Sequence, residues 1–302
     1  MTDPRATGPA QRRLRQIAEF PLVAMLIAGA WLGITVAIVG NAVEQLPLGP
    51  TPAIRQVAGG LILVAISIAV YKMAIRKLGA HPRDDLRRDH AVRDLALGLA
   101  GGALLFSLVT LVAAMAGVYK IVGWGDARSI LFVAVTFAIV PGVMEELLFR
   151  GILFRHLEDF GGSWLALALT SALFGGAHFF NPNATAFSSF AIAVEAGLLL
   201  GGAYMLTRAL WAPIGLHAAW NFTQSQLFDV PVSGFDGTGL VEAKLSGPEL
   251  LSGGAFGLEG SLIALVIVSG AGVWLVARAV CAGHVVRPWW VLRRLVRIDP
   301  GD

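Results

Sequence analysis

Charged residues are scarce in this sequence: Asp, Glu, Lys and Arg make up 14% of the 302 residues, whereas hydrophobic residues make up 56%. Soluble domains carry about 25% charged and about 45–50% apolar residues. The 23 basic and 20 acidic residues are too few to cover a globule of this length. The composition therefore excludes a soluble enzyme, and the apolar content excludes a disordered chain.

Cysteine is also nearly absent, since Cys281 is the only one in the chain. No internal disulfide can form, so cysteine gives no information about the redox compartment. The net charge of +3 gives no reason to expect nucleic acid as a partner. No soluble domain, repeat or low-complexity tract is recognisable, so we expect one integral membrane domain over residues 1–302.

Long apolar runs, in contrast, are abundant. The first follows several arginines but is longer than the apolar core of a signal peptide, so we expect an uncleaved span. A transmembrane helix needs about 20 residues, and the pattern lacks the alternation typical of strands. We therefore expect an all-α polytopic membrane protein with about eight helices, over residues 20–40, 54–74, 95–118, 129–154, 163–180, 190–206, 209–222 and 261–280.

The distribution of Lys and Arg predicts the orientation of the chain. Basic residues gather in the amino-terminal tail, between the second and third spans, and in the carboxy-terminal tail. With eight spans these regions share one face, which the positive-inside rule makes cytoplasmic. The longest connection, residues 223–260, carries one basic residue, Lys244, and is expected outside as an ordered loop or re-entrant element. The predicted location is the cell (inner) membrane, with both termini cytoplasmic.

The fourth span contains two adjacent carboxylates, Glu145 and Glu146. An ionisable side chain at bilayer depth is unfavourable by several kcal/mol and needs a partner or a function. Glu146 and Arg150 have the i,i+4 spacing that favours an ion pair on a helix. Glu145 has Phe149 at that position, so by elimination Glu145 is the free carboxylate. The alternative is one packing salt bridge that holds all three charged groups.

Two histidines lie in the fifth and seventh spans. His178 follows Phe174 by four residues and is preceded by small residues that permit close approach. His217 and Asn221 are also four residues apart and project from one helix face. Either histidine alone could be a helix–helix hydrogen bond. At 1.5 Å per residue, Glu145, His178 and His217 lie roughly 21, 25 and 12 Å from the cytoplasmic side, so they could converge inside the bilayer.

These groups permit two chemical readings. In the first, Glu145 is a general base that activates a water held also by His178, while His217 and Asn221 stabilise the oxyanion. In the second, Glu145, His178 and His217 bind a divalent metal, most plausibly zinc. Both end in hydrolysis by an activated water. Spacing does not separate them, although Asn221 is a poor zinc ligand and favours the first.

Together the motifs resemble those of the CPBP family of intramembrane proteases, which includes CAAX prenyl endopeptidases and Abi-type bacterial proteins. The family pattern EExxxR, FxxxH and HxxxN appears in order as Glu145 to Arg150, Phe174 to His178 and His217 to Asn221. The resemblance covers about residues 130–225, the expected catalytic core within spans 4–7. It implies an eight-helix fold with a cavity open to the membrane.

The resemblance also implies roles for the motif residues. Glu145 would activate water with His178 as its partner, and His217 and Asn221 would stabilise the transition state. Glu146 and Arg150 would support them. Family members are labelled metalloproteases, yet related structures have also been interpreted as glutamate-type proteases without a catalytic metal. The expected substrate is a membrane-associated or lipidated peptide or protein, and the remaining partner is membrane lipid.

A competing class is a non-catalytic membrane protein, either a bacteriocin-immunity or peptide-binding scaffold or a proton-coupled transporter. Intramembrane Glu and His also mark proton pathways. Transporters often show two matching halves, and no such symmetry is visible. The clustering of the ionisable groups in three spans with motif spacing favours the hydrolase.

Overall fold

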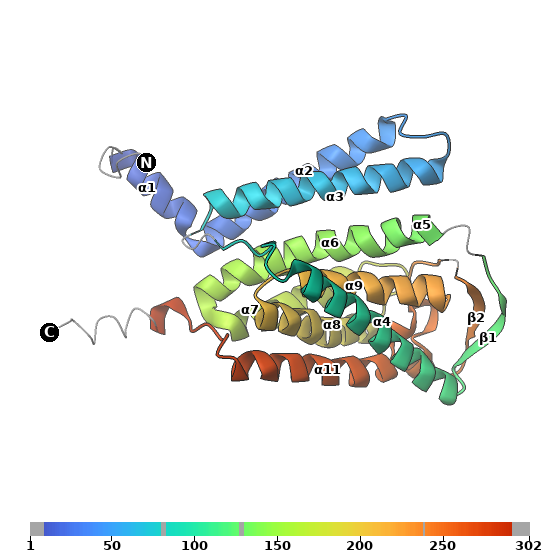
Figure 1. Cartoon of the computed structure of the whole chain (residues 1–302). Helices are drawn as coiled ribbons and strands as arrows, with labels where there is room; N and C mark the ends of the chain where they lie inside the picture. The colour runs from blue at the N-terminus through green and yellow to red at the C-terminus, as the bar shows by residue number, and fades with distance from the viewer. Residues whose placement is uncertain (1–8, 80–82, 127–129, 238, 292–302) are drawn as a thin grey trace.

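The computed structural model describes residues 9–79, 83–126, 130–237 and 239–291. Most of this chain is helical (Figure 1). The longer helices are α1 (Pro9–Glu19), α2 (Pro21–Gln45), α3 (Pro52–Lys77), α4 (Ala91–Met115), α7 (Arg155–His178), α8 (Ala186–Thr207), α9 (Trp211–Phe222) and α11 (Leu262–Cys281). A helical run before α7 consists of α5 (Ile130–Val133), η2 (Ala134–Ile139), α6 (Val140–Glu146) and η3 (Leu147–Phe154).

The described chain contains six helices that are long and apolar enough to cross a membrane. All eight segments expected from the sequence are helical, but two of them are not counted separately. The fourth and fifth expected segments form one helical run of 49 residues, Ile130 to His178, and count as one. The seventh, α9, has only 12 residues and is not counted. The all-α polytopic membrane fold is confirmed, whereas the number of crossings stays a prediction.

The 49-residue run reverses its direction at Gly162, between the expected spans 129–154 and 163–180. Gly162 has φ 82°, a conformation that breaks the helix and that side-chain-bearing residues rarely adopt. The rings of Phe149 and Phe174, one from each arm, lie 4.8 Å apart, centroid to centroid. The two arms therefore run side by side and bring their motifs to the same level.

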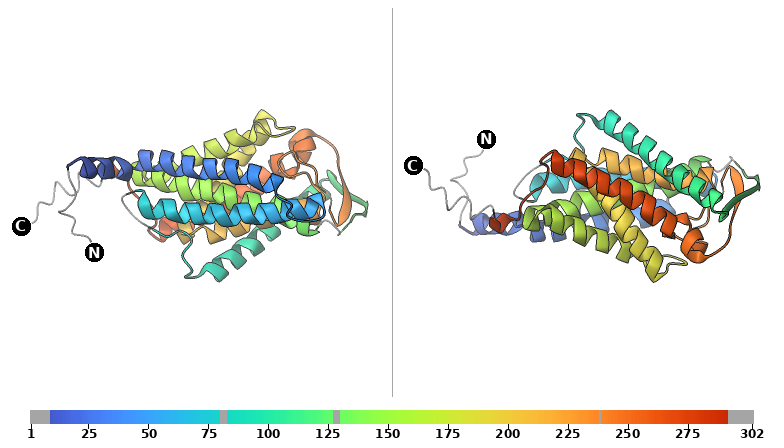
Figure 2. Two further views of the ribbon diagram at one scale, coloured as in Figure 1. Left: turned by 90° about the horizontal axis from the view of Figure 1, so that it is seen from above. Right: turned by 90° about the horizontal axis from the view of Figure 1, so that it is seen from below.

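Helices α4 and α9 pack closely because glycine lets their backbones approach. A Cβ atom at Gly98 would lie 2.3 Å from the carbonyl oxygen of Ala212, and one at Gly102 would lie 2.3 Å from that of Leu216. Figure 2 shows α11 alongside α4 and α8, while α2 and α3 pair on the opposite side of the bundle. Helix α9 is thus enclosed by other helices.

One end of the bundle carries α1, the connection from α3 to α4 and the chain after α11 (Figure 1). The ring of Phe160 contacts Phe20, Trp289 and Trp290 there, with centroids 5.9 to 6.5 Å apart. This grouping agrees with the expectation that the basic regions share one face. Part of the basic set lies outside the described residues, namely Arg5, Arg293, Arg294, Arg297 and the side chain of Arg12.

Several charges at this end form a buried network. Asp85 is fully buried and pairs with Arg83, at 2.7 Å, and with Arg155. Glu158 is also fully buried and binds Arg208 through both carboxylate oxygens. The backbone carbonyl of Asp85 accepts a hydrogen bond from the N–H of Leu210, 2.8 Å away, at the start of α9. The network therefore connects α7, the end of α8 and the beginning of α9.

The opposite end contains a small sheet that the sequence analysis did not predict. Strands β1 (Tyr119–Trp124) and β2 (Val241–Leu245) pair antiparallel, with Tyr119 opposite Leu245 and a bulge between Ile121 and Gly123. The sequence makes strands unlikely within the apolar runs, and both of these strands, five or six residues long, lie outside those runs.

The connection from α9 to α11 folds back onto the bundle rather than forming a peripheral loop. It contains η4 (Thr223–Leu227), β2, α10 (Glu249–Ser252), η5 (Gly254–Phe256) and η6 (Leu258–Gly260). Phe256 and Leu258 are almost completely buried. This connection brings Ser233 and Glu259, from far along the chain, next to the motif residues of α7 and α9.

Candidate active site

The helix that carries Glu145 and Glu146 is interrupted by π-helical turns on both sides. Such turns occur frequently at functional sites. Glu146 is completely buried, whereas the side chain of Glu145 keeps 32% of its exposure. The two adjacent carboxylates therefore have different environments, as the sequence predicts.

Arg150 holds Glu146 in the expected ion pair. Its Nη1 atom lies 2.9 Å from Oε1 of Glu146, and its Nη2 atom donates to the carbonyl of Ala196 at 3.1 Å. The guanidinium also lies over the ring of Phe174, 4.8 Å from its centroid. Arg150 thus connects the helix of the glutamates to α7 and α8.

His217 lies between the two glutamates. Its Nδ1 atom is 3.0 Å from Oε1 of Glu146, and its Nε2 atom is 4.0 Å from Oε2 of Glu145. Helices α6 and α9 approach this closely because Gly142 faces Ala218, which a Cβ atom at position 142 would contact at 3.1 Å. From the sequence, His178 is expected to be the partner of Glu145 in activating water. In the structure the histidine beside Glu145 is His217.

His178 ends α7 and is half-buried. Its Nδ1 atom lies 2.8 Å from the carbonyl oxygen of Phe174, and its ring packs on that of Phe174 with centroids 4.6 Å apart. When Nδ1 donates to this carbonyl, Nε2 is the nitrogen left to bind another group. The ring of Phe174 also contacts that of His217, with centroids 6.1 Å apart, so Phe174 packs against both motif histidines.

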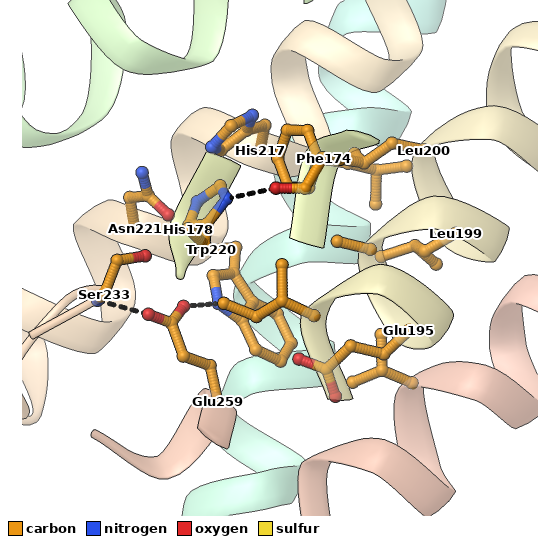
Figure 3. A pocket seen from close by; sticks show the side chains of 14 residues that line it. Phe174, His178, Glu195, Leu199, Leu200, His217, Trp220, Asn221, Ser233 and Glu259 are labelled. Atoms are coloured by element: carbon orange, nitrogen blue, oxygen red, sulfur yellow. Dashed lines mark hydrogen bonds between the residues drawn. The ribbon is translucent and has the colours of Figure 1, made fainter. Parts of the chain in front are cut away.

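A pocket joins three of the predicted residues. His178, His217 and Asn221 line it together with Phe174 (Figure 3). His217 and Asn221 are 8% and 6% exposed, respectively, so α9 presents both to the interior. The volume of the cavity is about 50 Å³. Glu145 contacts this group through His217 and is not among the residues that line the pocket.

The pocket also contains functional groups that sequence reasoning missed. Glu195 of α8 and Glu259 of η6 both line it, as do Trp220 and Ser233 (Figure 3). Glu259 accepts hydrogen bonds from the indole N–H of Trp220, at 3.2 Å, and from the backbone N–H of Ser233. The signal for Glu195 was present in the sequence, since it is a carboxylate inside a predicted span.

Burial raises the pKa of Glu259, while the hydrogen bonds from Ser233 and Trp220 and the charge of His178 act in the opposite direction. The two donors thus compensate part of the cost of burying this carboxylate. His178 lies near enough to Glu259 for a positive charge on its ring to stabilise the Glu259 carboxylate. The acidic side of the pocket and this motif histidine therefore interact electrostatically.

The residues of the metal reading do not form a chelating set here. Among the described residues, no group of three or more His, Cys, Asp or Glu side chains is arranged to hold a metal ion. Nδ1 of His217 is engaged by Glu146, and Nδ1 of His178 by a backbone carbonyl, an arrangement that leaves Nε2 of each ring for another ligand. Zinc sites normally place their ligands at about 2.0–2.2 Å from one ion. The chemistry of the Nε2 atoms suits a metal, but in the described chain Glu145, His178 and His217 are not gathered closely enough to share one ion.

Comparison with known proteins agrees with the geometry. Residues 127–223 match the model of the family described as type II CAAX prenyl endopeptidase Rce1-like. No curated protein and no solved structure gives a significant match. The matched segment contains all three motifs, from the helix of Glu145 to the end of α9. The predicted resemblance is thereby confirmed: residues 127–223 are similar to the Rce1-like type II CAAX prenyl endopeptidases.

Proposed function

We propose that this protein is an intramembrane endopeptidase in which Glu145 is the general base. The observation that carries the proposal is the unequal use of the two glutamates. Glu146 is completely buried, and its Oε1 atom is bound by Arg150 and His217. Glu145 keeps 32% of its side-chain exposure and makes no hydrogen bond within the described residues, and Nε2 of His217 lies 4.0 Å from its Oε2 atom. A partly exposed carboxylate that makes no hydrogen bond is available to accept a proton from water.

The reaction that follows is hydrolysis of a peptide bond. Glu145 takes a proton from a water molecule, which His178 helps to orient, while the water oxygen attacks the scissile carbonyl carbon. The oxyanion of the tetrahedral intermediate accepts hydrogen bonds from Asn221 and His217. Glu145 then returns the proton to the amide nitrogen, the C–N bond breaks, and the carboxyl and amine products separate.

His217 needs protons on both ring nitrogens for this role. Nδ1 donates to the Glu146 carboxylate, so Nε2 donates to an oxyanion only in the imidazolium form. Two carboxylates flank the ring and supply the negative charge that this form requires. With Arg150, the four side chains then sum to zero net charge, which suits a site enclosed by apolar helices.

The substrate class in this proposal is a membrane-associated protein or peptide. The site lies among apolar helices, and the family match is to endopeptidases of CAAX type. The proposed core comprises residues 130–225 within a single domain of residues 1–302. The proposed location is the cell (inner) membrane, with both termini cytoplasmic.

The test is cleavage of a panel of membrane-inserted peptides by detergent-purified protein and by its Glu145→Gln variant. The variant keeps the shape of the side chain but not the base, so we expect kcat to fall by about 10²–10⁴. Glu242→Gln is the matched control, because Glu242 is exposed on β2. Unchanged turnover in Glu145→Gln would refute the assignment.

Chelation separates the glutamate reading from the metal reading. We expect activity to survive exhaustive chelation in a preparation whose metal content has been measured. Stoichiometric metal in the parent that is lost in His217→Ala, with activity restored only by added metal, would refute the glutamate reading. A correctly folded protein that binds peptides without cleaving any would favour the scaffold alternative.

A further inference from the structure

Glu195 carries a buried carboxylate to which neither the fold nor the proposed mechanism assigns a role. It lies in the middle of α8, is 2% exposed, and lines the pocket (Figure 3). Its Oε2 atom is buried and has no hydrogen-bond partner within the described chain. An unpartnered buried carboxylate is unfavourable by several kcal/mol, so its retention calls for a ligand.

Glu259 provides a second carboxylate on the same side of the pocket. Two donors hold it in place, the indole of Trp220 and the backbone N–H of Ser233. Both are donors that stabilise a carboxylate anion. Glu195 and Glu259 are near enough for their charges to repel, and Figure 3 shows both below the motif histidines.

Within the described residues, no lysine or arginine forms an ion pair with Glu195 or Glu259, and His178 acts on Glu259 alone. Arg150 contacts the residue after Glu195, but its donors are directed to Glu146 and the Ala196 carbonyl. His178 is the only basic residue among the pocket-lining groups besides His217. Because His217 is engaged with Glu146, His178 is the one basic group of the pocket left for two carboxylates, and it acts on Glu259 and not on Glu195.

The remaining walls of the pocket are apolar. Aliphatic side chains from α8, α9 and α11 form them: Ile192, Leu199, Leu200, Leu216 and Val268. A cavity with aliphatic walls and carboxylates at one side matches an alkyl chain that ends in a positive charge.

We propose that Glu195 and Glu259 form a subsite that binds a cationic group of the substrate, either a lysine or arginine side chain or an amino-terminal ammonium. The substrate part of this statement rests on the proposed peptidase function. The binding part does not, since a cation binds to the pair whether or not a peptide bond is cleaved. The same pocket holds His178, His217 and Asn221, so a bound cation anchors the polypeptide beside the reacting groups.

Binding is tested on detergent-purified Glu145→Gln protein, which removes turnover from the measurement. The probes are butylammonium and butylguanidinium, with neutral butylurea as the isosteric control, and the readout is the saturable rise in Tm. We expect the two cations, and not butylurea, to raise Tm. An equal rise with butylurea, or no rise with either cation, would overturn the proposal.

The variants identify the residues. Glu195→Gln should weaken cation binding on the order of 10- to 100-fold, because a charge-assisted hydrogen bond is lost. This variant removes no hydrogen bond to Oε2, so it tests the proposal even when Glu259→Gln, which disturbs Ser233 and Trp220, does not fold. Glu242→Gln should bind like the parent. Parent-like affinity in Glu195→Gln would refute the subsite.

Cleavage distinguishes this proposal from the peptidase proposal. Wild-type protein is given membrane-inserted peptides that carry Lys, Arg or neutral norleucine at one position near the scissile bond, with free or acetylated amino termini. We expect kcat/KM to favour the cationic peptides, and Glu195→Gln to abolish the preference. Cation binding without cleavage would refute the peptidase alone, whereas cleavage with no charge preference in wild type would refute the subsite alone.

Discussion

Arg150 and Glu146, one helical turn apart, form an ion pair from which solvent is excluded at both side chains. Their shortest N–O distance is 2.9 Å, and the same Glu146 oxygen also accepts from His217. A buried pair adds little net stability compared with apolar residues of similar shape, but removing one partner leaves an uncompensated charge. The main contribution of the pair is therefore to fix the position of His217.

Glu146→Gln should destabilise the protein by about 3–5 kcal/mol, because Arg150 is left without its counter-charge. The measurement is thermal unfolding in detergent. The double variant Glu146→Gln, Arg150→Met should recover part of the loss, since it removes the stranded guanidinium as well. A single variant as stable as the parent would contradict the role assigned to this pair.

Asn221→Ala should reduce kcat by about 10²–10³ and leave KM nearly unchanged, as expected for loss of one oxyanion donor. The side chain is 6% exposed and lines the pocket, so its Tm should be recorded alongside the kinetics. A rise in KM with unchanged kcat would instead assign Asn221 to ground-state binding of the substrate.

Gly102→Ala should lower both activity and stability, because the new methyl group would lie 2.3 Å from the carbonyl oxygen of Leu216. Overpacking of this kind typically costs about 1–3 kcal/mol, and here it pushes α4 away from the helix of His217. Gly270→Ala in α11 is the matched control, since nothing lies within 4 Å of its added Cβ. Equal effects in both variants would show that helix propensity, not packing, is measured.

Reporter fusions at each terminus should both report the cytoplasm, and a reporter inserted near Lys244 should report the opposite side. The physical reason is the positive-inside rule, together with the position of α1 and the end of α11 at one end of the bundle (Figure 1). Opposite locations for the two termini would imply an odd number of crossings.

Local spacing predicted the parts of the site that lie on one helix. The ion pair of Glu146 with Arg150 follows from i,i+4 geometry, and the turn near Gly162 follows from the break between two apolar runs. Which histidine lies beside Glu145 does not follow from spacing. It depends on the approach of α6 to α9, which Gly142 permits.

Residues that became functional candidates only in three dimensions were harder to predict. Glu259 lies in a Gly- and Ser-rich connection, and its burial arises only because that connection folds back onto α8 and α11. The pairing of β1 with β2 joins segments more than a hundred residues apart, so no local pattern indicates it. Glu195 was visible as an intramembrane carboxylate but belonged to no motif.

The shortness of α9 has a consequence for the lipid around the protein. Its 12 residues and the five of η4 that continue it span about 25 Å, less than the roughly 30 Å of a bilayer's hydrocarbon layer. Its first turn is fixed by the Asp85 carbonyl, so the depth of His217 is set by protein contacts. Hydrophobic mismatch with thicker or thinner bilayers therefore acts on the α2–α3 pair, whose Leu26, Ile34 and Ile38 are exposed. The tilt of that pair should adjust to acyl-chain length while the reacting groups keep their spacing.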